Sequence, residues 1–306
     1  MGGKATSSED ERTGVKALER RARAILKARP AYAEMVEFYL TVFRRQLEWR
    51  DRLMVHPEEV SSDQVQGLLR EGKVLKEQYD PGLDSDSLMR LWSQMKADFA
   101  EGNEVLCEAV GKIEAAEARG DLVAATWLME QRPERGDLIT DASERIGVDA
   151  SVLATLARSV TFPHWAFVSE AWVAESPHEV WKRPHCPVCG CIAGLVELRK
   201  EASGLENTTS VSRRYGHCPF CGTRWVLPSV SCLSCGSTKA GDAKYFFASE
   251  EPDLRIDFCN RCHHYVKVVD GGKMSGRIHV GLELLTASHL DVIARDKHLS
   301  PLEVSA

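Results

Sequence analysis

The sequence lacks the marks of a membrane protein, of a secreted protein and of the common enzyme classes. No apolar run in its 306 residues approaches the roughly 18 residues that a membrane-spanning helix needs. The polar start has no apolar secretory core, so we expect residues 1–14 to form a disordered N-terminus. The motifs GxSxG, HExxH, GxGxxG and the phosphate-binding P-loop are missing. We therefore expect no catalytic residues and predict that the protein is not an enzyme.

Strong charge of one sign is also absent. The formal net charge is −6, and the hydrophobic content of 43% is ordinary for a soluble globular protein. Residues 181–270 carry 12 Lys and Arg against 9 Asp and Glu, a difference of +3. This local excess is too small to predict a nucleic-acid surface, so a nucleic-acid partner is not expected.

Cysteine is scarce in the first 185 residues, where only Cys107 occurs, and abundant after them. Nine of the ten cysteines lie between Cys186 and Cys262. Disulfide-rich scaffolds are usually small, secreted and poor in apolar residues, and this chain has neither an export signal nor a shortage of apolar residues. The clustered thiols therefore indicate metal or redox chemistry. We expect Cys107, inside a helical pattern, to be a buried small hydrophobe.

The first part of the chain has helical periodicity. Apolar residues recur at i, i+3, i+4 and i+7 from Tyr32 to Phe43. Asp84 and Asp149 stand where N-caps are expected, and Gly120 ends another helical run. We predict an all-α domain over 15–178. The tryptophans at helical positions are expected in its core, and they are Trp92, Trp127, Trp165 and Trp172.

Beyond Pro177 to Pro184 glycine, proline and cysteine take over, and short β-rich runs appear. The predicted strands are 195–198, 211–215, 223–227, 245–247, 254–258 and 265–269. They divide into two small β-rich four-cysteine modules, 183–229 and 230–272, and a C-terminal helix is predicted over 276–298. The expected fold class is therefore α+β, with an all-α N-terminal domain followed by the two modules and the closing helix.

Eight of the cysteines form four CxxC pairs, and they are the candidate metal ligands Cys186, Cys189, Cys218, Cys221, Cys232, Cys235, Cys259 and Cys262. Two residues between cysteines let one tight turn aim both sulfurs at the same ion. Three pairs are followed by glycine, which permits the backbone conformation that closes such a turn. The fourth is followed by His263, which would have to adopt an unusual conformation there, unless this turn is of another type.

Eight thiolates make two complete four-sulfur sites. Sequential pairing joins the first two pairs and the last two, with 28 and 23 residues between the joined pairs. A cross-braced pairing is the alternative, and we favour the sequential one because each half reads as a self-contained hairpin pair. Such closed sites are usually structural or electron-transferring, and both zinc and iron accept them.

Five residues near the ligands are left without an assigned role. Cys191 lies two residues after a ligand and is read as an inert neighbour, with a reactive thiol or a metal-exchange position as the alternative. Four histidines flank ligands and are expected at the surface, with replacement of a cysteine or a hydrogen bond to a sulfur as the alternative, and they are His185, His217, His263 and His264.

The cysteine-containing segment resembles the formate dehydrogenase accessory protein family (FdhE). The residues that carry the resemblance are His185–Gly190, Arg214–Cys218, Cys221–Trp225, Val230–Cys235, Cys259–Cys262 and the run Tyr265-Val-Lys-Val. The order of helical part, four CxxC pairs and final helix is also similar to that family. The resemblance implies a cytoplasmic maturation factor that acts on the catalytic subunit of formate dehydrogenase before export. It also implies two rubredoxin-like modules with iron in the cages formed by the eight cysteines, zinc being the alternative.

The main hypothesis is therefore a non-catalytic accessory protein whose rubredoxin-like domain recognises the immature subunit or passes redox equivalents to it. Two other classes stay open. One is a zinc-ribbon adaptor that binds nucleic acid or another protein, which the small positive excess in 181–270 favours. The other is a rubredoxin-like electron carrier, which a reversible one-electron reduction would reveal.

Overall fold

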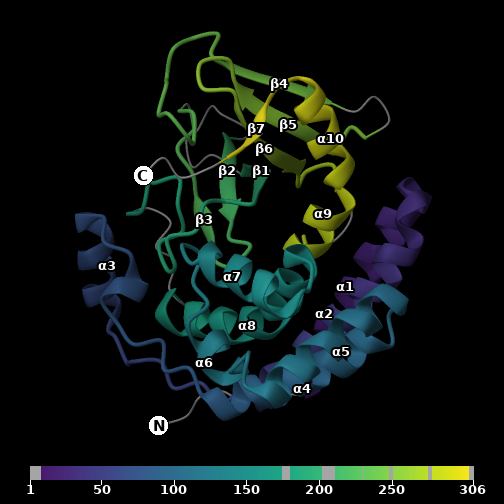
Figure 1. Cartoon of the computed structure of the whole chain (residues 1–306). Coiled ribbons are helices and arrows are strands. Elements are labelled where there is room, and N and C mark those ends of the chain that lie inside the picture. The colour runs from purple at the N-terminus through teal and green to yellow at the C-terminus, as the bar shows by residue number, and fades with distance from the viewer. Residues whose placement is uncertain are drawn as a thin grey trace.

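The computed structural model describes residues 8–173, 180–201, 211–229, 231–247, 251–274 and 278–302. They form a helical half, then a β-sheet, then two helices that close the chain beside the sheet (Figure 1). The predicted α+β fold class is confirmed. The helices of the first half are α1 (Ser8–Ala28), α2 (Ala33–Trp49), α3 (Ser62–Glu71), α4 (Ser85–Ala100), α5 (Glu104–Arg119), α6 (Ala124–Met129), α7 (Gly136–Ile146) and α8 (Ala150–Val173). Short 3-10 turns lie at Pro30–Tyr32, Arg50–Arg52 and Leu75–Glu77.

Side chains at the predicted positions set the ends of these helices. The Asp84 carboxylate accepts a hydrogen bond of 2.6 Å from the Ser87 backbone N–H and caps α4. The Asp149 carboxylate does the same for α8 through the N–H groups of Ser151 and Val152. Gly120 ends α5 in the left-handed conformation, with φ of 77°. The three boundary signals found in the sequence are therefore confirmed.

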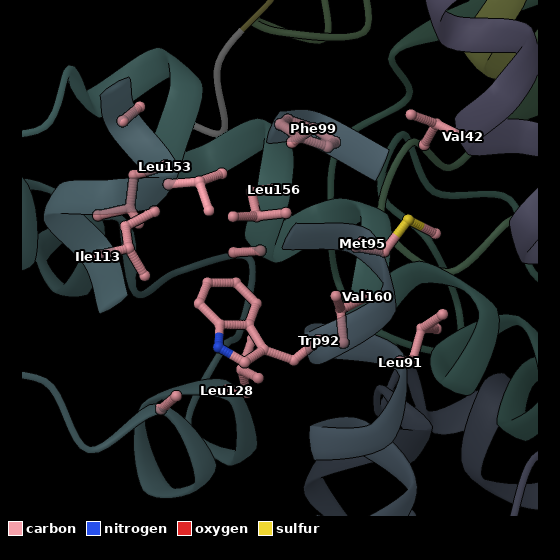
Figure 2. Packing of buried hydrophobic residues seen from close by; sticks show 14 of the residues in the cluster. Val42, Leu91, Trp92, Met95, Phe99, Ile113, Leu128, Leu153, Leu156 and Val160 are labelled. Atoms are coloured by element: carbon pink, nitrogen blue, oxygen red, sulfur yellow. The ribbon is translucent and has the colours of Figure 1, made fainter. Parts of the chain in front are cut away.

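The core of the helical half lies between α4, α5 and α8. Trp92, Met95 and Leu156 are fully buried and lie close together with neighbouring apolar side chains (Figure 2). All four tryptophans that the helical pattern placed in the core are buried. Since fully burying such side chains contributes about 1.5–3 kcal/mol each, this cluster accounts for much of the stability of the helical half.

Two expectations for this half differ from the structure. Helix α1 begins at Ser8, within the segment 1–14 that was expected to be disordered, and residues 1–7 lie outside the described residues. Cys107 is exposed, so the expectation of a buried thiol was wrong. The buried face of α5 is formed by residues such as Val110 and Ile113, and Cys107 lies one position off that face, in line with Gly111.

The strands form one sheet. Their bounds are β1 (Leu195–Glu201), β2 (Val211–His217), β3 (Arg224–Val226), β4 (Ala243–Phe247), β5 (Leu254–Cys259), β6 (His264–Asp270) and β7 (Ser300–Pro301). The order across the sheet is β3-β2-β1-β6-β5-β4, and β7 pairs with the start of β6. All six predicted strands are present. The two-residue β7 is too short for any periodic signal to reveal.

The two predicted modules meet inside this sheet. The antiparallel strands β1, β2 and β3 belong to segment 183–229, and β4, β5 and β6 to segment 230–272. They are joined by the parallel pair β1–β6, in register from Leu195↔Lys267 to Leu198↔Asp270. The two cysteine-containing segments therefore share one backbone hydrogen-bond network, which fixes their relative position.

The end of the chain ties the sheet to the helical half. Segment 276–298, predicted as one helix, contains α9 (Val280–Thr286) and α10 (Ser288–Asp296), and Ala287 separates them. Glu283 on α9 is fully buried and forms a 2.6 Å ion pair with the buried Arg21 on α1. Helix α10 packs Leu290 on the sheet. Because the Arg21–Glu283 pair is buried, removing either partner would leave an uncompensated charge, which costs about 3–5 kcal/mol.

Candidate metal centres

The eight candidate cysteines converge into two groups. Cage 1 consists of Cys186, Cys189, Cys218 and Cys221, and cage 2 of Cys232, Cys235, Cys259 and Cys262. Within each group the sulfur atoms all lie within 4.8 Å of one another. The grouping corresponds to the sequential pairing of the CxxC motifs, and the two groups could hold two metal ions.

The spacing of the sulfurs fits a tetrahedral ion. A metal–sulfur bond of about 2.3 Å in a tetrahedron places the sulfurs roughly 3.8 Å apart. In cage 1 the distances are 3.5 Å between Cys186 and Cys221 and 3.4 Å between Cys189 and Cys218. In cage 2 the pairs Cys232–Cys262 and Cys235–Cys259 are 3.7 and 3.9 Å apart. These separations exceed a disulfide bond of about 2.05 Å and match sulfurs that share an ion.

The protonation equilibria of the thiols also favour a cation. Burial raises the pKa of the Cys189 and Cys218 thiols far above the ordinary range. Burial of Cys186 acts in the same direction, but hydrogen bonds with the other three cysteines outweigh it and lower the pKa of that thiol. Cage 1 therefore favours ionisation of one thiol and opposes that of others. In cage 2, burial raises the pKa of Cys232 to about 12. Four thiols packed so closely cannot all ionise in isolation, whereas a bound metal ion supplies the charge that stabilises four thiolates.

All four CxxC turns have the same backbone geometry. In each, the N–H of the residue after the second cysteine donates to the carbonyl of the first, and the donors are Gly190, Gly222, Gly236 and His263. The glycines have φ of 76°, 72° and 68°, and His263 has φ of 59°. Of the two alternatives for His263, the structure shows the unusual left-handed conformation, at a cost of about 1–2 kcal/mol, and not a turn of another type. Strand β7 supports it, because the Ser300 N–H donates to the His263 carbonyl over 2.9 Å.

Cage 1 is enclosed between the sheet and the helical half. Its four cysteines have no exposed surface. The N–H groups of Leu75 and Lys76 donate to the carbonyls of Pro187 and Val188, which are the two residues inside the first CxxC turn. On the other side, Trp165 of α8 packs against Phe220 in the second turn, with ring centroids 5.4 Å apart. The helical half thus holds both turns of this cage.

A chain of hydroxyl groups connects α8 to a sulfur of cage 1. The Thr223 hydroxyl lies 2.9 Å from the Cys221 sulfur and 2.6 Å from the hydroxyl of Ser169. If Cys221 holds a metal as a thiolate, which only accepts hydrogen bonds, then Thr223 would donate to the sulfur and Ser169 would donate to Thr223. Both hydroxyl-bearing residues are buried. Through this pair of hydroxyl groups the helical half reaches a sulfur of cage 1.

A buried carboxylate supports cage 1 from the sheet. Glu197 on β1 accepts a 3.0 Å hydrogen bond from His217, the residue before Cys218, and a 2.9 Å bond from Arg224. Burial favours the protonated acid, but the hydrogen bond from His217 and the charge of Arg224 hold the pKa of Glu197 at about 2. The expectation of a surface position for His217 was wrong, because it pairs with Glu197 inside the sheet.

Cage 2 has less protein around it. Cys259 is buried, Cys232 and Cys262 are half-buried, and Cys235 is exposed. Burial of the Cys262 thiol raises its pKa, but hydrogen bonds from the backbone and side chain of His264 outweigh this effect and lower the pKa to about 6. Among the described residues, none of the helical half contacts this cage through a hydroxyl pair as Ser169 contacts cage 1 through Thr223.

The other cysteine of the segment and three of the histidines singled out in the sequence lie beside the cages. Cys191 is half-buried beside cage 1, where its carbonyl accepts from the Cys186 N–H and its thiol contacts Cys218. His263 is exposed as expected, whereas His185 and His264 are half-buried. His185 packs edge-on against Trp181, with ring centroids 5.0 Å apart.

One serine–histidine pair exists in the helical half, and its burial explains why it is structural. Ser87 and His164 are fully buried, and the Ser87 hydroxyl lies 3.1 Å from the His164 ring. The second ring nitrogen lies 2.9 Å from the Val160 carbonyl, and burial lowers the pKa of His164 to about 4. The pair has its hydrogen-bond partners inside the helical core, where a substrate has no access.

The fold and sites define an α+β protein with two four-cysteine groups, one enclosed and one near the surface, that could hold two metal ions. No family model matches the chain. The chain is 28% identical to the FdhE homolog of Aquifex aeolicus over 126 residues, which are 41% of this chain and 42% of that protein. It is 30% identical to the FdhE homolog of Haemophilus ducreyi over 135 residues, 43% of this chain and 40% of that protein. These matches thus span less than half the length of the curated relatives.

A solved structure extends the likeness to nearly the whole fold. The crystal structure of the FdhE protein from Pseudomonas aeruginosa superposes with a TM-score of 0.59 over 95% of both chains, at 14% sequence identity. The resemblance to the FdhE family that the cysteine motifs carry is therefore confirmed. Among the described residues, no helix is both long and apolar enough to cross a membrane.

Proposed function

We propose that this protein is a non-catalytic accessory factor for the maturation of formate dehydrogenase, and that it binds the catalytic subunit of that enzyme in the cytoplasm. The observation that carries the proposal is the pair of four-sulfur groups in a chain similar to FdhE proteins. Four sulfurs would occupy all four coordination positions of a tetrahedral ion, so neither cage would leave a position at which water or substrate could be activated. This favours recognition or electron exchange over hydrolysis.

In this proposal the eight cysteines are the metal ligands. Iron is favoured because the FdhE resemblance implies rubredoxin-like sites, and zinc is the alternative because the same sulfur geometry accepts it. Metal analysis of anaerobically purified protein, together with its visible spectrum, separates the two. Two coloured iron equivalents per chain are expected, and a colourless protein with two zinc ions would overturn the assignment of iron.

The role in maturation is tested in the source organism. Deletion of the gene is expected to abolish most formate dehydrogenase activity, and the unmodified gene is expected to restore it. The matched pair of variants is Cys218→Ser, which removes a cage 1 ligand, and Cys107→Ser, which removes an exposed thiol of the helical half. Only Cys218→Ser should fail to restore activity. Undiminished activity in the deletion strain would refute the proposal.

A second candidate function is electron transfer, and the position of cage 2 favours it. A sulfur ligand at the surface, such as that of Cys235, shortens the path for an electron to a partner. A reversible one-electron reduction of iron-loaded protein, lost in Cys235→Ser, would support this candidate. The zinc-ribbon adaptor that binds nucleic acid is not favoured, since nothing beyond the small positive excess points to it.

A further inference from the structure

The two edges of the sheet differ in how they are covered. Strand β3 is three residues long, and its central Trp225 is fully buried. Strand β4 has five residues, four of which are exposed, and within the described residues it pairs only with β5. It lies at the end of the molecule that points away from the helical half (Figure 1). Proteins usually shorten, charge or cover sheet edges, because an open edge can pair with another chain.

The exposed face of β4 carries two aromatic rings. Tyr245 and Phe247 are 59% and 46% exposed, and their ring centroids are 5.4 Å apart. Arg255 lies over the Tyr245 ring at 4.8 Å, and Lys273 lies over the Phe247 ring at 5.8 Å. Beside Phe247 is a small pocket whose lining includes Leu198 and Lys273. Two adjacent exposed rings next to a pocket are typical of a surface that another molecule covers.

Two lysines near this edge have no ion-pair partner among the described carboxylates. They are Lys239 and Lys244, and both are exposed. Asp257 pairs with Arg255 and Asp270 with Lys273, while the carboxylate of Asp242 accepts a hydrogen bond from the Ser237 hydroxyl. An occupant with carboxylate side chains would neutralise the two lysines, whereas a basic one would be repelled.

The edge is also continuous with cage 2. Ala243, at the start of β4, is paired with the ligand Cys259 on β5. The Asn260 N–H, next to that ligand, donates to the Asp242 carbonyl just before β4. A molecule bound along β4 would therefore lie beside cage 2, which is the more exposed of the two cages.

We propose that the free edge of β4, with Tyr245, Phe247, Lys239 and Lys244, is the surface that binds the partner protein. The occupant is an extended segment that adds to the sheet as a further strand and presents apolar and acidic side chains. Backbone hydrogen bonds give the affinity, and the two rings and two lysines give the selectivity. The inference deepens the proposed function and rests on it, since the partner is the catalytic subunit of formate dehydrogenase.

Two variants test the surface directly. Tyr245→Ser combined with Phe247→Ser removes the rings, and Lys239→Glu combined with Lys244→Glu reverses the charge. All four side chains are exposed, so circular dichroism and metal content should not change. The control is Phe167→Ser, because Phe167 is an exposed aromatic residue on α8. Binding to the purified catalytic subunit is measured by calorimetry. Each double variant should bind about tenfold more weakly or worse, and the control should bind as the unmodified protein does.

Peptides that tile the catalytic subunit then identify the mode of binding. The peptide that binds should be rich in apolar and acidic residues. N-methylation of its alternate amides should abolish binding in one register and leave it unchanged in the other, because only one set of N–H groups faces β4.

The outcomes separate the two proposals. If the unmodified protein does not bind the subunit at all, the proposed function fails. If it binds, but both double variants bind equally well, the function stands and the β4 surface is wrong. Two other outcomes would overturn the inference. If the unmodified protein forms a dimer that the ring variant loses, the occupant is a second copy of the chain. If it binds single-stranded oligonucleotides and the ring variant does not, the occupant is a nucleic acid.

Discussion

Cage 1 and cage 2 are built by the same turns, yet they lie in different surroundings. All four turns share one backbone hydrogen bond and one left-handed residue. Cage 1 has no exposed sulfur and is supported by Leu75, Trp165 and Thr223. Cage 2 has the exposed Cys235 and lies beside an open strand. The CxxC turn therefore determines how the sulfurs are arranged, while the packing around it determines how far each group of sulfurs is exposed.

The largest difference should appear when one ligand is removed from each cage. Cys218→Ser is expected to prevent stable folding of the sheet, because cage 1 joins it to the helical half. The binding free energy of a structural metal site, about 10–16 kcal/mol, is in effect folding free energy. Cys235→Ser should release one metal equivalent and leave the fold intact. Metal content and thermal unfolding of the two variants give the answer. Equal losses of stability would mean that the two cages are equivalent supports.

A second difference lies in the buried carboxylate beside cage 1. Glu197→Gln should destabilise the protein by about 3 kcal/mol at pH 7, because it leaves His217 and Arg224 without their anion. The folded pKa of Glu197 is about 2, below the ordinary 4.5, so its contribution is complete above pH 4.5 and is lost as the pH falls toward 2.

Chemical denaturation from pH 8 to pH 3 checks this. The penalty of Glu197→Gln should be constant down to pH 5 and shrink below 4.5. A penalty that instead grew on acidification would show that Glu197 is protonated in the folded protein. The control is Asp257→Asn near cage 2, where a half-buried acid is paired with the half-buried Arg255, and its penalty should be smaller than that of Glu197→Gln because more of the pair is in contact with water.

Much of the fold was accessible from the sequence because its signals are local. The CxxC spacing determines which sulfurs share a turn, and the periodicity of residues such as Trp92 places them in a core. His263 marks the limit of such signals, since its position in the motif left either a left-handed residue or a turn of another type, and the structure shows the first. Two candidate sulfur groups therefore follow from the order of the residues.

The surroundings of the cages were not accessible because they depend on contacts between distant segments. His217 was expected at the surface, but Glu197, twenty residues earlier, accepts its hydrogen bond in the folded sheet. Thr223 has no sequence signal beyond its place after the second cysteine pair, and its partner Ser169 comes from α8. The parallel pairing of β1 with β6 likewise joins segments that no local pattern connects.

The two cages should also differ in the rate at which a chelator removes their metal ions. Cage 2 should release its ion about tenfold faster than cage 1, because a chelator reaches Cys235 directly, whereas cage 1 must open locally first. Release is followed by absorbance in the presence of excess chelator. The fast phase should be missing in Cys235→Ser, which assigns it to cage 2. A single phase of two equivalents in the unmodified protein would contradict the difference in accessibility.

The smallest expected effect concerns two hydroxyl groups, one in the residue after Gly222 of cage 1 and one in the residue after Gly236 of cage 2. Thr223 and Ser237 occupy equivalent positions, but Thr223 donates to a ligand sulfur, while Ser237 donates to Asp242 over 2.6 Å. Thr223→Val removes a hydrogen bond to a thiolate and leaves Ser169 without a buried partner, at a cost of about 1–2 kcal/mol. It should also shift the sulfur-to-metal charge-transfer absorption band of cage 1. A thiolate that loses a hydrogen bond gives more electron density to its metal ion. Ser237→Ala should leave that spectrum unchanged. If both variants shift it equally, the hydroxyl acts through the shape of the turn and not through its bond to the Cys221 sulfur.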